Sequence, residues 1–458
     1  MARRPLWHLP AAATLVAAAL ALGGCQGVAR LSGSTSSPGP LPAGISVAFN
    51  HNENQRYRSP INGQWRRGDN LEAFILEGIN GAKREILVAV QELSLPRVAE
   101  ALVRRHHDGL TVRVILENTY STPWSQEHPA DLSPHQRTRH TQLEALGWGD
   151  AVAMLQRQGV PLIDDTADGS KGSGLMHSKF MVIDRRSVIT GSANFTPSCI
   201  HGDPDDPRTR GNVNHLLRFD SPALATLFAD EFSRMWGDGP GGAPDSHFGI
   251  AKESAPLQQV KVGATPVAVL FAPHRRTDPN NGLTLINTLL SGAKRQVDLA
   301  LFVLSDQSLS NTLGQLQRRG VKIRLLADPG FANRSFSEVL DLLGTQLPDR
   351  HCKLEAGNKP LQQPIEGVGT PRLAGGDKLH HKLAVIDGQR VITGSFNWSP
   401  SAAHQNDETL LVIDSPQLAR HFTAEIDRLW RGAELGVSAR LARKQARQRA
   451  LCGSGSTR

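Results

Sequence analysis

The chain has 458 residues, more than a single domain usually contains, so two domains or two fused halves are expected. Hydrophobic residues make up 39% of the chain, which excludes an intrinsically disordered protein. The formal net charge of +8 favours an anionic partner, either nucleic acid or a phospholipid surface, and does not distinguish between them.

The first 25 residues have the features of a targeting segment. Arg3 and Arg4 precede an apolar run at 11–22, which is too short to remain as a transmembrane anchor. The run leads into LGGC at 22–25, which resembles the lipobox of bacterial lipoproteins, where the cysteine (here Cys25) is lipidated and becomes the new N-terminus. The alternative is an ordinary cleaved signal peptide.

Residues 26–44 include a Ser-, Gly- and Pro-rich run and are predicted to form a flexible tether. No later run has the roughly 18 apolar residues of a transmembrane helix. We therefore expect an exported protein, lipid-anchored on the periplasmic side of a bacterial cell envelope. The remaining cysteines, Cys199, Cys352 and Cys452, form no zinc-binding or CxxC pattern. One pair can form a disulfide in an oxidising compartment, and the sequence does not say which.

Four segments of the chain occur twice in the same order. The pairs are GAKREILVAVQELS (81–94) with GAKRQVDLALFVLS (292–305), GLTVRVILE (109–117) with GVKIRLLAD (320–328), HSKFMVIDRRSVITGSANFTPS (177–198) with HHKLAVIDGQRVITGSFNWSPS (380–401), and DSPALATLFADEFSRMW (220–236) with DSPQLARHFTAEIDRLW (414–430). Only loop insertions change the offsets, which indicates two fused copies of one unit. We place them at 45–236 and 264–431, with a linker at 237–263 and a basic tail at 432–458.

Both copies predict the same elements in the same order. These are a strand (47–49; 267–271), an amphipathic helix (71–79; 283–290), a buried strand (86–90; 297–303), a second helix, a strand (111–116; 321–326), two strands joined by a short turn, and a helix that ends at Trp236 or Trp430. Strands that alternate with helices predict an α/β fold, with an α/β/α sandwich around a mixed sheet in each half.

Each copy also contains the pattern H-x-K-x-x-x-x-D followed by G-S-x-N. The residues are His177, Lys179, Asp184, Gly191, Ser192 and Asn194 in the first copy, and His380, Lys382, Asp387, Gly394, Ser395 and Asn397 in the second. In a strand, His177 and Lys179 lie on the same face, and burying both is costly unless an anion lies between them. A solvated edge strand would explain one copy, but not two copies in register.

These paired motifs resemble the signature of the phospholipase D superfamily, and the resemblance covers about residues 46–431. It implies two tandem phospholipase D-like halves with mixed sheets, which meet across a pseudo-twofold interface to build one active site. It also implies cleavage of a phosphodiester without a metal or other cofactor, through a phosphohistidine intermediate. The motif is much less specific for the substrate.

The residue types fit this chemistry because a phosphodiester is anionic. Lys179 and Lys382 supply positive charge to the non-bridging oxygens, and Asn194 and Asn397 supply neutral hydrogen-bond donors. Hydroxyl groups of two serines in the GSxN motifs are expected around the phosphate pocket, namely Ser192 and Ser395.

One neutral imidazole attacks phosphorus, and a second, protonated imidazole donates to the leaving oxygen. The resemblance implies that His177 is the nucleophile and His380 the general acid, and the opposite assignment stays open.

Asp184 and Asp387 are predicted to be structural, because the parity of the strand places them on the opposite face from the histidine of their own motif. The acid expected to orient a histidine is Glu408, which resembles the downstream acidic position of the family. The aligned residue in the first half is Asn214, so the two histidines are not equivalent. We hypothesise that the partners cross between the halves and that Glu408 serves His177.

No metal site is expected, because a lysine lies two residues from each histidine and no HExxH motif occurs. The segments 118–140 and 199–211 are predicted to be loops, either lids that shape specificity or solvated surface. The stretch 439–450 is basic and helix-prone, which fits a solvated terminal helix or a contact with a membrane or nucleic acid.

The leading functional prediction is a lipoprotein phospholipase D that hydrolyses or transfers phosphatidyl groups. The alternative is an exported nonspecific nuclease of the same superfamily that cleaves DNA or RNA. A phosphate-binding protein with a decayed site is a third possibility, against which the intact His, Lys and Asn of both copies argue. Because both motifs lie in one chain, we expect a monomer.

Overall fold

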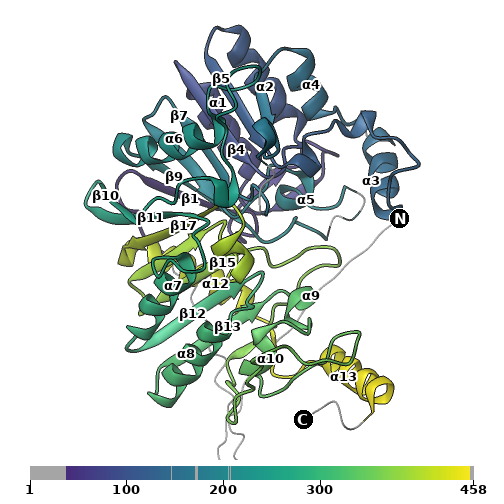
Figure 1. Cartoon of the computed structure of the whole chain (residues 1–458), viewed down its shortest axis with the longest axis vertical. Helices are drawn as coiled ribbons and strands as arrows, with labels where there is room; N and C mark the ends of the chain where they lie inside the picture. Colours follow the sequence, from purple (N-terminus) through teal and green to yellow (C-terminus); the bar gives the residue numbers. More distant parts are fainter. Residues whose placement is uncertain (1–37, 146, 171–173, 205, 207, 454–458) are drawn as a thin grey trace, which may run out of the picture. The chain divides into compact units, whose positions relative to one another are not determined.

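The computed structural model describes residues 38–145, 147–170, 174–204, 206 and 208–453, which include two large sheets (Figure 1). The predicted lipidation site Cys25 and most of the tether lie outside the described residues. The first sheet has seven strands, in the order β1 (Ile45–Phe49), β9 (His215–Asp220), β8 (Ser187–Gly191), β7 (Lys179–Ile183), β4 (Glu85–Val90), β5 (Thr111–Leu116) and β6 (Leu162–Asp164).

The second sheet repeats this order and adds one strand at each edge. Its nine strands are β10 (Gln258–Val262), β11 (Thr265–Ala272), β17 (Glu408–Asp414), β16 (Arg390–Gly394), β15 (Lys382–Ile386), β12 (Gln296–Leu301), β13 (Lys322–Ala327), β14 (Val368–Thr370) and β18 (Glu434–Leu435). The linker 237–263 therefore contributes β10 to this sheet, and the tail 432–458 contributes β18. In the first sheet, β4 with β5 and β5 with β6 are parallel pairs. In the second sheet, β12 with β13 and β13 with β14 are parallel pairs. All other pairs are antiparallel, so both sheets are mixed.

Helices cover both faces of each sheet. The α-helices of the first half are α1 (Leu71–Gly81), α2 (Pro96–His107), α3 (Pro134–Ala145), α4 (Ala151–Arg157), α5 (Pro197–Ile200) and α6 (Pro222–Trp236). Those of the second half are α7 (Gly282–Ser291), α8 (Gln307–Arg318), α9 (Pro329–Ala332), α10 (Glu338–Leu342), α11 (Pro400–His404), α12 (Pro416–Trp430) and α13 (Ala439–Cys452). Helices α6 and α12 both begin with Ser-Pro: Ser221 and Ser415 accept hydrogen bonds from the third backbone N–H that follows, and proline occupies the first helical position.

Alternation along the strands divides the core into layers. In β4, Ile86 and Val88 join an outer cluster with α1, α2 and α4, whereas Leu87 and Ala89 join an inner cluster. The inner cluster contains side chains from both sheets and from α6 and α12. A third cluster packs α7, α8 and α10 on the second sheet. The predicted sandwich is therefore confirmed for both halves, and the halves share their inner layer.

Aromatic side chains connect the two halves through this inner layer. Phe228 of α6 contacts Phe180 of β7 and Phe271 of β11, each with ring centroids 5.1 Å apart. Phe422 of α12 makes a similar contact with Phe49 of β1, also at 5.1 Å. Each inner helix thus packs on the sheet of the other half as well as on its own. Edge-to-face contacts of this kind add to the free energy of burial.

Some of the structure was not anticipated from the sequence. A hairpin of β2 (Arg56–Arg58) and β3 (Trp65–Arg67) follows β1, and α3 begins inside the segment 118–140, which was expected to be a loop. The Ser133 hydroxyl accepts the backbone N–H of Gln136 there, and Pro134 takes the first position of the helix. The disulfide joins Cys352 to Cys452, and Cys199 is a buried free thiol.

The linker also supplies a buried lysine to the core. Lys252 donates to the carboxyl groups of Glu231 on α6 and of Asp407, the latter at 2.7 Å, and all three side chains are 2% exposed. Asp407 also accepts the backbone N–H of Gly249 at 2.9 Å. One ammonium group therefore bridges two buried carboxyl groups that approach from opposite halves of the chain, and Arg234 adds a second positive charge at Glu231. No described helix is long and apolar enough to cross a membrane.

Removal of this lysine should destabilise the fold, because the Asp407 carboxyl group would stay buried without its counter-charge, and Glu231 would keep only its ion pair with Arg234. We expect Lys252→Met to lower the free energy of unfolding by about 3–5 kcal/mol, the usual cost of breaking a buried ion pair. Urea unfolding measures this change, and Lys261→Met, at an exposed position on β10, is the matched control. Equal stability of the two variants would contradict the assigned role.

Candidate active site

Main-chain bridges between the halves bring the two motifs together. Met176 pairs with Asp407, and Val213 pairs with Leu379, each as an isolated parallel bridge. The next residue after each bridge is a site residue, so Glu408 is placed beside His177 and Asn214 beside His380. Backbone N–H groups of both histidines take part, with His177 N donating to Asp407 O at 3.0 Å and His380 N donating to Val213 O at 3.1 Å.

The first half-site pairs His177 with an acid from the second half, as hypothesised from the sequence. The Nδ1 atom of His177 lies 2.8 and 2.9 Å from the two carboxyl oxygens of Glu408. Ser395 donates its hydroxyl to the same group at 2.6 Å. Because a carboxylate only accepts, Nδ1 carries the proton and Nε2 is left free to attack.

The second half-site has the same geometry with an amide in place of the acid. His380 Nδ1 lies 3.0 Å from the Asn214 side-chain oxygen, and Ser192 donates to that oxygen at 2.8 Å. The Asn214 amide nitrogen donates to two backbone carbonyls, those of Cys199 and Asn212, which fixes the orientation of the amide. His380 therefore also carries its proton on Nδ1 and presents Nε2 to the site.

The motif lysines are buried on the strands that follow the histidines. Lys179 and Lys382 are 0% and 1% exposed, and each amine donates to the backbone carbonyl of the histidine two residues earlier. Burial lowers the pKa of Lys179 to about 8, with Glu408 opposing this effect. Burial and the charge of Lys179 hold the pKa of Lys382 well below its usual value.

The environment of the histidines shows that both half-sites form one site. Burial lowers the pKa of His177 to about 4, an effect that Glu408 opposes and the two lysines reinforce. Burial also holds the pKa of His380 well below its usual value, and the positive charges of Lys382, Lys179 and His177 lower it further. Four groups that can carry positive charge thus influence one another, and Glu408 is the acid that opposes the lowered pKa of both His177 and Lys179. A phosphodiester bound among these groups would favour their positively charged forms.

A difference between the half-sites was missed at the sequence level. Gln91, at the end of β4, accepts hydrogen bonds from Lys179 at 3.3 Å and from the Asn194 amide at 3.2 Å. The aligned residue in the second half is Phe302, whose ring lies 4.9 Å from the Lys382 amine and 4.7 Å from the His380 ring. The signal was present in the aligned segments VAVQELS and LALFVLS, but its meaning depends on knowing that this strand end contacts the lysine.

Asn194 lies in the site beside Gln91, and Asn397 has the equivalent position in the second half. Asn194 and Asn397 are at equivalent positions after β8 and β16, and each has a buried side-chain oxygen without a partner among the described residues. The Asn194 amide nitrogen uses one hydrogen for Gln91 and keeps the other for a further acceptor. A phosphate oxygen is the acceptor that the predicted role requires.

Asp184 and Asp387 lie at the turns that connect the motif strands, away from the histidines. Asp184 accepts backbone N–H groups of Lys83, Arg84 and Glu85, at 2.7 to 2.9 Å for the shortest contact of each. Asp387 does the same with the three aligned residues, Lys294, Arg295 and Gln296. Both aspartates have positive φ, at 52° and 54°, at the first position of the three-residue turn that joins the two motif strands. This geometry supports the structural interpretation.

Behind the second half-site lies a buried imidazole pair that the sequence analysis did not identify. His215 Nδ1 and His381 Nδ1 are 3.0 Å apart, so only one of the two atoms carries a proton. His381 Nε2 contacts Glu425 at 3.1 Å, and His215 Nε2 contacts the Thr393 hydroxyl at 2.8 Å. A detectable signal was the acid that occurs at the same place in both copies of the last helix, Glu231 and Glu425.

A known family model matches both halves of the chain. The family model described as "Cardiolipin synthase, PLD-like domain" matches residues 75–236 and 286–430. The chain belongs to this family. Each matched segment contains one complete PLD-like motif, and together they include the histidines, lysines and asparagines of both half-sites.

Relatives of the PLD-like family show moderate similarity to this chain. Mitochondrial cardiolipin hydrolase of Xenopus laevis is 27% identical over 175 residues, which are 38% of this chain and 72% of that protein. Phospholipase D of Rickettsia typhi is 29% identical over 146 residues, 32% of this chain and 61% of that protein. The crystal structure of phosphatidylserine synthase from Haemophilus influenzae aligns with a TM-score of 0.52 at 13% identity, and covers 85% of this chain and 89% of that one. This last likeness concerns the fold.

The described residues contain no group of three or more His, Cys, Asp or Glu side chains that could hold a metal ion. The donor set of the site is instead two imidazoles, two amines and two amides, which suits binding of a phosphate group by charge and hydrogen bonds. The arrangement can perform nucleophilic attack from one Nε2 and proton transfer from the other.

The acid in the first half-site should be required for the chemical step. We expect Glu408→Gln to lower kcat by roughly 10²- to 10⁴-fold towards a soluble phosphodiester such as bis(p-nitrophenyl) phosphate, because the positive charge that develops on His177 loses its partner. KM should change little, since the lysines remain. Glu77→Gln, at an exposed position on α1, is the control. An unchanged kcat in Glu408→Gln would contradict the role.

The lowered pKa values of the lysines predict an alkaline limit to activity. Lys179 is charged below its pKa of about 8 and becomes neutral as the pH rises through that value, so the free enzyme loses charge for binding an anion. We expect kcat/KM to fall as the pH is raised above about 8, because kcat/KM reports the free enzyme. A pH–rate profile from pH 6 to 10 measures this, and a flat profile over the range would contradict it.

Proposed function

We propose that this chain is an exported phospholipase D-type enzyme that cleaves the phosphodiester of glycerophospholipids, by hydrolysis or by transfer of the phosphatidyl group. The observation that supports it best is the pair of imidazoles that present Nε2 to one site, held by Glu408 and Asn214 and flanked by two buried lysines. Membership of the PLD-like family agrees with this chemistry.

The proposed first step forms a covalent intermediate. Binding of the anionic substrate raises the proton affinity of His380, which then carries a second proton, on Nε2. His177 Nε2 attacks phosphorus while the bond from phosphorus to the head-group oxygen breaks, and His380 gives this Nε2 proton to that oxygen. Glu408 stabilises the positive charge that develops on His177, and Lys179 and Lys382 stabilise the phosphate oxygens. The head-group alcohol leaves, and the phosphatidyl group stays on His177.

The second step reverses the proton transfer. His380 takes a proton from water, the water oxygen attacks phosphorus, and the bond between phosphorus and His177 breaks. The products are phosphatidic acid and the regenerated enzyme. An alcohol in place of water gives a phosphatidyl alcohol, so the same residues support hydrolysis and transfer.

An apolar cavity supports a lipid substrate. It has a volume of about 310 Å³, and its lining includes Ile61, Leu143, Trp148 and Pro197. Pro197 follows Asn194 by three residues, and Asp377, which also lines the cavity, precedes His380 by three. A cavity lined by segments that adjoin both motifs in the sequence is a candidate for the apolar part of the substrate.

The place of action is also a proposal. The apolar run at 11–22 and Cys25 favour export and lipid anchoring, which would bring the site to phospholipid. The two half-sites belong to one chain, which favours a monomer.

The test uses the chain in EDTA with mixed phospholipid vesicles in one reaction and plasmid DNA in a second. Release of phosphatidic acid that His177→Ala abolishes would support the proposal, with His107→Ala, at an exposed histidine on α2, as the control. Nicked DNA with intact vesicles would instead establish a nuclease. If neither reaction proceeds in EDTA and a divalent metal restores activity, the result would contradict the metal-free mechanism.

A further inference from the structure

The basic tail forms an ordered helix, α13, which packs through one narrow stripe. Leu441, Gln445, Gln448 and Cys452 follow each other at helical spacing, and all four are buried or half-buried. Leu441 is the one fully buried side chain in the described residues of this helix. Most of the surface of α13 therefore faces away from the protein.

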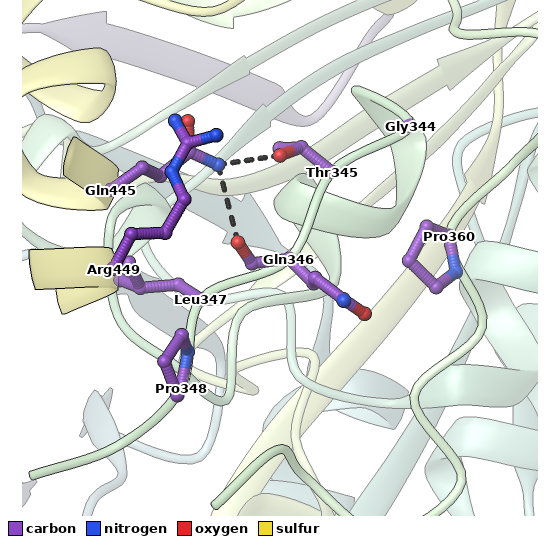
Figure 2. A pocket seen from close by; sticks show the side chains of 8 residues that line it. All are labelled: Gly344, Thr345, Gln346, Leu347, Pro348, Pro360, Gln445 and Arg449. Atoms are coloured by element: carbon purple, nitrogen blue, oxygen red, sulfur yellow. Dashed lines mark hydrogen bonds between the residues drawn. The ribbon is translucent and has the colours of Figure 1, made fainter. Parts of the chain in front are cut away.

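Several separate contacts nevertheless hold α13 in place. Ser438 caps its first turn, and Lys444 donates to the Asn333 carbonyl at 2.6 Å. Gln445 donates to the Thr345 hydroxyl and the Gln346 carbonyl, at one side of a cavity of about 380 Å³ (Figure 2). The disulfide from Cys352 fixes the C-terminal end. A helix that adds one side chain to the core is thus fixed at both ends and in the middle.

The free surface of α13 carries positive charge without compensation. The helix has five basic residues and no acidic one: Arg440, Arg443, Lys444, Arg447 and Arg449. Arg440, Arg443 and Arg447 are exposed and follow the spacing i, i+3 and i+7, so they form a stripe along one side. Partial burial and the nearby charges of Arg334 and Arg440 lower the pKa of Lys444, which shows how closely the charges are gathered.

Exposed apolar side chains accompany this charge. Seven large hydrophobic residues are exposed in the described part of the chain, and four of them belong to α13, to the segment that leads into it or to the loop beneath it. These are Leu451 (73% exposed), Val437 (46%), Leu435 (43%) and Phe336 (40%). Leu451 continues the basic stripe at i+11. Exposed apolar groups among cations are typical of surfaces that insert into the head-group region of a bilayer.

We propose that α13, together with Phe336, is a docking surface for bilayers that contain anionic phospholipid. The cations would contact the anionic head groups, and Leu451, Val437 and Phe336 would enter the boundary with the acyl chains. A nucleic acid would use the cations but would have no use for the exposed aliphatic side chains, so the bilayer is the better fit. The proposal does not depend on which diester the active site cleaves.

The test is vesicle binding by residues 38–458, which form one compact unit and lack the apolar N-terminal run. The His177→Ala background prevents turnover of the vesicles. Co-sedimentation with phosphatidylcholine vesicles containing phosphatidylglycerol should be lost at least about 10-fold in Arg443→Glu/Arg447→Glu, because each cation near an anionic surface contributes to binding. Leu451→Ser should weaken binding several-fold at the same surface charge.

The control is Arg104→Glu/Arg157→Glu, which changes the net charge equally at exposed positions of α2 and α4 and should bind like the parent. Urea unfolding midpoints check that all variants are folded. Equal loss of binding in both charge-reversal pairs would show a nonspecific charge effect and overturn the proposal. Unchanged vesicle binding with lost DNA binding in the α13 variant would also overturn it, in favour of nucleic acid.

Discussion

The site depends on two main-chain bridges between the halves. One joins Met176, which precedes His177, to Asp407, which precedes Glu408. The other joins Leu379 to Val213, the residues before His380 and Asn214. A bridge of this kind fixes the backbone of both segments, so the side chains of the next residues are held beside each other. The hydrogen bonds from His177 to Glu408 and from His380 to Asn214 are a direct result, and with them the choice of tautomer.

On this common frame the two half-sites differ in polarity. In the first half-site His177 contacts an acid and Lys179 contacts a glutamine, whereas in the second His380 contacts an amide and the ring of Phe302. Glu408 favours positive charge on His177, as a phosphorylated imidazole needs. The apolar surroundings of His380 disfavour positive charge, which makes its proton easier to transfer once a bound phosphate has raised the proton affinity. The asymmetry fits a nucleophile in the first half and a proton donor in the second.

Repetition made much of this predictable. Matching segments identified the duplicated unit and the motif residues, because these features recur at fixed spacing. Glu408 does not recur, since Asn214 is its counterpart, and it was assigned by its resemblance to the acidic position of the family. Features that occur once escaped: Lys252 lies in a linker without a counterpart, and its partners became visible only in three dimensions. The pairing of Cys352 with Cys452 depends on a Cα distance of 5.5 Å between residues 100 positions apart, which spacing alone cannot give. Helix α3 escaped because its polar sequence has no apolar periodicity.

The single linker has a consequence for how such a fused protein can diverge. Glu231 and Glu425 are equivalent, yet the first binds Lys252 and the second binds His381. A homodimer of identical units would have to place the same groups around both acids. In the fused chain the two acids can have different neighbours, because the single linker supplies its lysine to only one of them. Two polypeptides obtained by cutting the chain within 237–263 would together retain both motifs. Their reassembly would depend on whether Lys252 of the cut linker still binds Glu231 and Asp407.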